Sequence, residues 1–160
     1  MAFGLVLSAV LIYVTVTSDP TEGLDYASGD KPEEMRKPVC FSDSGPCPPT
    51  GFKWIVPASG VVQTRFAREE IDERTKFRGW VRLDAAMFTK DEVRSCAATV
   101  DWSLLADGKP VARGTIKADS EDREVAGRSP REARFVLFTA RRTDSLPCSS
   151  TLQWVYAGLD

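Results

Sequence analysis

Cysteine is the residue type whose spacing most directly predicts chemistry in this 160-residue chain. The chain has four cysteines, at Cys40, Cys47, Cys96 and Cys148. Cysteines of an exported protein form disulfides, and four cysteines allow three pairings. We expect Cys40–Cys47, because a turn-rich loop separates them, and Cys96–Cys148, on the strand argument given below. A four-cysteine zinc site is the alternative, but the sequence has no C-x-x-C knuckle.

Histidine is absent from the chain. Its absence excludes Ser-His-Asp and Cys-His catalysis, histidine-ligated zinc and the usual histidine pH switch. Glu69 and Glu73 would share a face if their stretch were helical, but such spacing is too common to indicate a glycosidase. The acidic run 119–122 lacks the glycine and the closing glutamate of an EF-hand calcium loop. We therefore expect no enzymatic activity, no metal and no cofactor, with a histidine-independent carboxylate enzyme as the least favoured alternative.

Tryptophans are the candidates for contact with a partner. Trp102 and Trp154 are in phase with other apolar residues, which assigns them to the core. Trp54 and Trp80 are less constrained by the pattern, and Trp80 shares its strand face with Arg82. We therefore take Trp80, Arg82 and Trp54 as possible partner contacts.

The charge of the chain limits the classes of partner that we expect. The net charge of −2 provides no basic field, so we expect no nucleic-acid partner. Arg141 and Arg142 form a basic pair with further arginines nearby in sequence. An anionic partner for this cluster is conceivable, but one small cluster on a net acidic chain is a weak signal.

Residues 1–18, MAFGLVLSAVLIYVTVTS, contain no charged side chain. As a helix they would extend about 27 Å, close to the hydrocarbon thickness of about 30 Å. An uncleaved membrane anchor, a secretory signal peptide and a buried strand are the three interpretations. The segment lacks a basic n-region and an A-x-A cleavage site, which favours the anchor. We expect a single-pass protein of the cell membrane with its C-terminal domain extracytoplasmic; a secreted protein is the alternative.

The rest of the chain divides into two parts. Residues 19–50 are rich in Asp, Glu, Gly, Pro and Ser and predict a stalk or irregular lead-in. Residues 51–160 predict one antiparallel β-sandwich of about seven strands. The candidate strands are 52–56, 61–66, 77–88, 95–105, 110–118, 134–141 and 150–156. Asp107-Gly108 predicts a hairpin turn, while 68–76 and 89–94 could each form a turn or two of helix.

Alternation along two candidate strands identifies the core face. One strand is expected to point Cys96, Ala98, Val100, Trp102 and Leu104 inward. The last strand is expected to point Leu152, Trp154 and Tyr156 inward, with Cys148 in phase. Both cysteines would then meet in the core. The architecture resembles an immunoglobulin sandwich, but its fingerprint is missing, because Trp102 follows Cys96 too closely and Leu146 occupies the tyrosine-corner position.

These expectations combine into a membrane-anchored, extracytoplasmic binding or structural protein. It would act through protein–protein contacts, as an accessory subunit or surface protein attached to the membrane by residues 1–18. The alternative is a secreted or anchored module that binds a carbohydrate or another ligand.

Overall fold

The computed structural model describes residues 23–36, 49–68, 75–88 and 93–160. All regular elements in this part of the chain are β-strands. One sheet has the order β1-β4-β11-β8-β9, with strands Asp25–Gly29, Val61–Ala67, Phe135–Arg142, Thr99–Ala106 and Lys109–Lys117. The other has the order β10-β5-β12-β3-β2, with strands Arg123–Glu124, Phe77–Asp84, Ser150–Leu159, Pro49–Val56 and Glu33–Arg36.

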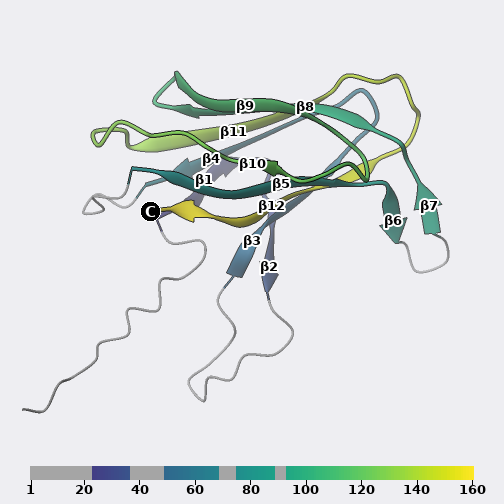
Figure 1. Ribbon diagram of the computed structural model, residues 1–160, viewed down its shortest axis with the longest axis horizontal. Coiled ribbons are helices and arrows are strands. Elements are labelled where there is room, and N and C mark those ends of the chain that lie inside the picture. Colours follow the sequence, from purple (N-terminus) through teal and green to yellow (C-terminus); the bar gives the residue numbers. More distant parts are fainter. Residues whose placement is uncertain (1–22, 37–48, 69–74, 89–92) are drawn as a thin grey trace, which may run out of the picture.

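The two five-stranded sheets pack face to face as a sandwich, which confirms the all-β prediction with more strands than expected. Neighbouring strands run antiparallel throughout both sheets. Figure 1 shows β8, β9 and β11 together in one layer, with β12 and β3 in the other. A small hairpin of β6 (Ala86–Phe88) and β7 (Val93–Ser95) projects at one end.

Aromatic rings from both sheets fill the space between the layers. Trp154 is fully buried, and its ring centroid lies 5.8 Å from that of Phe138 on the opposite sheet. Trp54 stacks on the same phenylalanine at 4.7 Å and donates its indole N–H to the Thr64 hydroxyl over 2.8 Å. Trp54 is only 4% exposed. Its expected role as a surface contact is therefore wrong, because its ring completes the core.

Strand β8 follows the predicted alternation. Its expected inward side chains, and those just before it, are all buried; they are Cys96, Ala98, Val100, Trp102 and Leu104. The hairpin to β9 is also confirmed, since Asp107 and Gly108 both have positive φ, at 45° and 80°. That combination is the one a two-residue hairpin requires.

The predicted stalk is wrong for residues 24–36. Leu24 is buried in the core, and the chain then forms β1 and β2, one at an edge of each sheet. Asp30 ties this segment to β4, because its carboxylate accepts the Gln63 N–H over 2.7 Å. Polar, exposed side chains are typical of edge strands, where they oppose pairing with other chains. The same composition made this region resemble a linker.

Two predicted strands are each interrupted. Segment 77–88 divides into β5 and β6 at Ala85, whose N–H donates to the Asp119 carboxylate over 3.0 Å. Segment 95–105 begins as a regular strand only at Thr99, after β7. Residues 93–94 belong to a strand, so the helical alternative for 89–94 is wrong there. The rest of that stretch, residues 69–74 and the Cys40–Cys47 pair lie outside the described residues.

Candidate functional site

The predicted Cys96–Cys148 disulfide is confirmed. The two residues are bonded, with Cα atoms 5.9 Å apart and 52 positions apart in sequence. Cys96 precedes β8 of one sheet and Cys148 precedes β12 of the other, so the bond joins the two layers. A disulfide closing a loop of this kind typically contributes about 2–4 kcal/mol.

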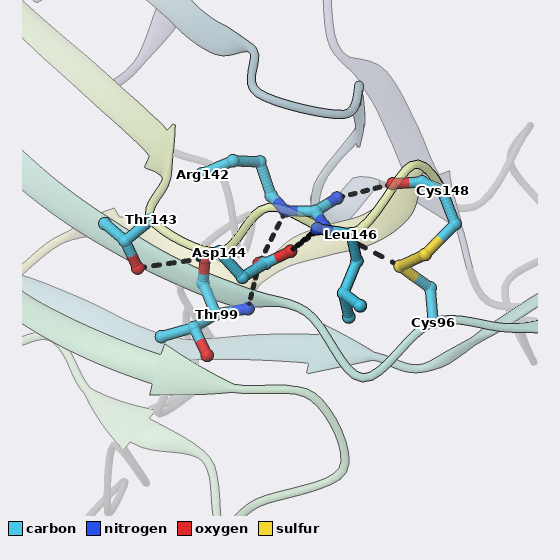
Figure 2. Close-up of polar contacts among 7 residues, drawn as sticks. All are labelled: Cys96, Thr99, Arg142, Thr143, Asp144, Leu146 and Cys148. Carbon is cyan, nitrogen blue, oxygen red and sulfur yellow. Dashed lines mark hydrogen bonds and ion pairs between the residues drawn. A yellow bond between two sulfur atoms is a disulfide. The ribbon is translucent and has the colours of Figure 1, made fainter.

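Arg142 packs against this disulfide with its side chain fully buried (Figure 2). Its guanidinium donates to the Cys148 carbonyl over 2.7 Å and, through two nitrogens, to the Asp144 carboxylate. Asp144 also accepts the Thr99 N–H over 2.7 Å and the Leu146 N–H over 3.0 Å. The Arg142 hydrogen bonds hold the pKa of Asp144 well below its usual range.

The Cys96–Cys148 disulfide, Arg142 and Asp144 form a structural cluster, which we call the clamp. Its hydrogen bonds are directed inward, to protein groups around the disulfide. The predicted basic pair is accordingly divided between two roles, since Arg142 is buried in the clamp while Arg141 is exposed.

The outer face of the β10-β5-β12-β3-β2 sheet carries an exposed pair of aromatic side chains. Trp80 is 43% exposed and Tyr156 is 44% exposed. Their ring centroids lie 5.9 Å apart in an edge-to-face arrangement of 83°, a favoured geometry for aromatic pairs. We refer to Trp80 and Tyr156 as the aromatic patch.

A β-bulge places Tyr156 beside Trp80. Val155 pairs with Trp80 and Gly158 pairs with Arg78, so that two residues of β12 lie opposite Gly79 alone. Tyr156 has a φ of 53°, unusual for a bulky residue. Gly79 has a φ of 110°, and a Cβ there would lie 2.4 Å from the Val155 carbonyl oxygen.

The expectation that Tyr156 faces the core is therefore wrong, because the extra residue shifts the alternation after Val155. Strained residues of this kind concentrate at functional sites. The sequence does contain a signal for the bulge, namely the isolated glycines 79 and 158 within strand patterns.

Beyond the aromatic patch, the same face of the sheet carries charged side chains that are paired with one another. Arg82 donates two hydrogen bonds to Asp122, over 3.0 and 2.7 Å, and these raise its pKa. Gln153 donates to Asp84, whose pKa is raised chiefly by burial. Lys53 lies 3.0 Å from Glu33 at the far side of the sheet. Several polar groups of this face are thus engaged with one another, whereas Glu124, which pairs with Trp80 itself, is exposed.

Of the predicted contact residues, Trp80 and Arg82 lie together on this face and Trp54 does not. Sequence reasoning missed Tyr156 and Asp122 as members of the same surface. Asp122 follows a loop in which Asp119 binds the Ala85 N–H. Among the described residues, no group of carboxylates and cysteines could hold a metal ion.

A search of the described residues for a membrane-spanning helix finds no helix of sufficient length and apolarity. The apolar segment 1–18 lies outside those residues. No protein-family model matches the chain, and comparison with curated proteins finds no match.

Proposed function

We propose that this chain is a non-enzymatic, membrane-anchored protein whose extracytoplasmic β-sandwich binds another protein through the aromatic patch. The observation that carries the proposal is the pair of exposed rings, Trp80 and Tyr156, held by a strained bulge. Tryptophan and tyrosine are enriched among the residues that dominate binding energy at protein interfaces.

The chemistry around the patch favours a protein partner over a sugar. A carbohydrate site needs convergent polar groups that are free to bind hydroxyls. Here Arg82 is already paired with Asp122, and Asp84 with Gln153. A partner with an apolar contact and a polar rim suits such a face better, because the existing pairs need not be broken.

Two features support the proposed location. The Cys96–Cys148 bond is of a kind that persists in oxidising compartments outside the cytosol. Residues 1–18 have the apolar composition of an anchor. We propose that this segment holds the chain N-in/C-out in the cell membrane, so that the domain can serve as an accessory subunit or surface protein.

Recovery of the full chain from native membranes tests the binding role. Trp80→Ala should reduce the amount of any stoichiometric co-purifying protein by about tenfold or more, as expected for a central aromatic contact. Val61→Ala is the matched control, since Val61 is similarly exposed, at 41%, but lies on the opposite sheet. If both variants co-purify the same amount of that protein, the aromatic patch is not part of the interface.

A carbohydrate-binding module is the second candidate, because Trp80 offers an exposed indole ring. A panel of glycans titrated against the full chain separates the two functions. Saturable binding of one glycan that is lost in Trp80→Ala would favour the carbohydrate role, whereas an absence of such binding leaves protein contact as the function of the patch.

A further inference from the structure

The outer face of the opposite sheet contains an open depression of about 540 Å³ over β8, β9 and β11. This size falls in the range of small-molecule sites. Six polar side chains line it: Asp101, Ser103, Arg113, Thr115, Thr139 and Arg141. Trp102 borders it too, with its side chain buried toward the core.

Strand register places the two arginines at opposite corners. Arg141 pairs with Asp101, which pairs with Thr115 on the other side. On the next outward-facing level along the strands, Thr139 pairs with Ser103, which pairs with Arg113. Two strand spacings and a two-residue offset separate the arginine Cα atoms by about 12 Å. Both long side chains can therefore reach one ligand of sugar size between them.

The charges of the depression are arranged for an acidic ligand. Within the described ranges, Arg113 and Arg141 have no ion-pair partner, whereas Arg82 and Arg142 each hold a carboxylate. Asp101 is the acidic side chain in the depression, and it accepts the Thr115 hydroxyl over 2.5 Å. A ligand here meets two guanidinium groups, one carboxylate and several hydroxyls.

We propose that this depression binds a hydroxylated carboxylic acid with the chemistry of an acidic sugar. The arginines supply charge-assisted, bidentate hydrogen bonds to a carboxylate. Ser103 and Thr139 can donate to or accept from sugar hydroxyls, and Asp101 can accept from them. The central Asp101 disfavours a simple polyanion, because it would repel each added negative charge. The inference is independent of the aromatic patch, which lies on the other sheet.

Backbone amide signals of the ¹⁵N-labelled full chain provide the test, because Ser103 and Thr139 pair with each other across the depression. Titration with glucuronate should shift the Ser103 and Thr139 signals saturably and leave that of the core residue Trp154 in place. Glucose, a neutral analogue, and inorganic sulfate, an anion without hydroxyl-bearing carbon, should each bind at least about tenfold more weakly. Triple-resonance spectra of a ¹³C,¹⁵N-labelled sample assign the signals.

Single substitutions then locate the ligand. Arg113→Gln and Arg141→Gln should each weaken glucuronate binding about tenfold or more through loss of a charge-assisted hydrogen bond. Arg123→Gln is the matched control, since it makes the same charge change on an exposed arginine of the other sheet and should leave the affinity unchanged. Asp101→Asn should tighten binding, because it removes the neighbouring negative charge.

Three results would overturn the proposal. They are unmoved Ser103 and Thr139 signals, equal binding of glucose or sulfate and glucuronate, and equal weakening by Arg123→Gln and Arg113→Gln.

Discussion

Arg142 is a buried cation whose hydrogen bonds reach both halves of the sandwich. It contacts Asp144 through two nitrogens and the Cys148 carbonyl through a third. A buried charge is tolerated when its partner and its hydrogen bonds are in place, and it is costly when either is removed. Asp144 is therefore the residue on which the clamp depends.

Asp144→Ala should lower the free energy of unfolding by about 3–5 kcal/mol, because Arg142 would remain buried without its carboxylate. Urea unfolding followed by tryptophan fluorescence measures the change. Glu132→Ala removes an exposed carboxylate instead and should change stability by less than about 0.5 kcal/mol. A loss below about 1 kcal/mol for Asp144→Ala would contradict the clamp.

The Asp144 carboxylate also makes the free energy of unfolding depend on pH. Since the folded-state pKa of Asp144 is lowered from 3.8, the unfolded chain binds more protons in acid and stability falls as pH decreases. The contribution is present above about pH 5 and is lost on acidification through and below the ordinary carboxyl range. Asp84 acts in the opposite direction, because burial raises its pKa and its protonation favours the folded state.

Unfolding free energies at several pH values compare the wild type with Asp144→Asn. The variant should show a shallower loss of stability in acid, because it lacks the titrating group. Parallel curves for the two proteins would show that Asp144 does not carry this dependence.

At the scale of elements, the β12 bulge is the feature that creates the aromatic patch. Gly79 faces the extra residue, and a Cβ at that position would also approach the Tyr156 carbonyl oxygen at 2.9 Å. Gly108 has a similarly positive φ in the β8–β9 turn but has open space around it. Comparing alanine substitutions at the two glycines therefore distinguishes the cost of backbone strain from the cost of steric overlap.

Gly79→Ala should cost about 1–3 kcal/mol more than Gly108→Ala, because both alanines adopt positive φ but only the former meets the β12 backbone. It should also alter the Trp80 indole resonance, since Tyr156 must move. Thermal or urea unfolding of the two variants measures the difference. Equal destabilisation would mean that the bulge does not require Gly79.

Alternation predicted the elements well where the strands are regular and less well where they are not. Strand β8 is continuous from Thr99, so side-chain parity identified its buried face. The same parity, extended back to Cys96, identified that cysteine as a core residue. Parity failed for Tyr156 because one inserted residue reverses every later assignment. It also missed β1 and β2, whose polar edge composition resembles a stalk.

The candidate site was predictable in part for the same reason. Trp80 and Arg82 share a regular strand, so their common exposure could be read from the sequence. Tyr156 and Asp122 reach that surface through a bulge and a turn, which depend on tertiary pairing. Trp54 was misassigned because the alternation of Phe52, Trp54 and Val56, all three buried, was not applied to its strand.

At the scale of the whole molecule, two packed sheets joined by the Cys96–Cys148 disulfide present two chemically different outer faces. One carries the aromatic patch amid paired charges, and the other carries two arginines beside hydroxyls. We propose that the first face binds a protein at the membrane surface and the second a small acidic ligand. The Arg142 side chain is buried and belongs to neither face.

Photo-crosslinking beside Trp80 in native membranes tests the protein-binding claim most directly. The benzophenone amino acid p-benzoylphenylalanine replaces Glu124, which pairs with Trp80, in one full-length sample and Val61, on the opposite sheet, in another, so that both rings of the patch are kept. The account predicts a discrete adduct of one protein species from position 124 and none from position 61. The same adduct from both positions, or no adduct from position 124, would contradict it.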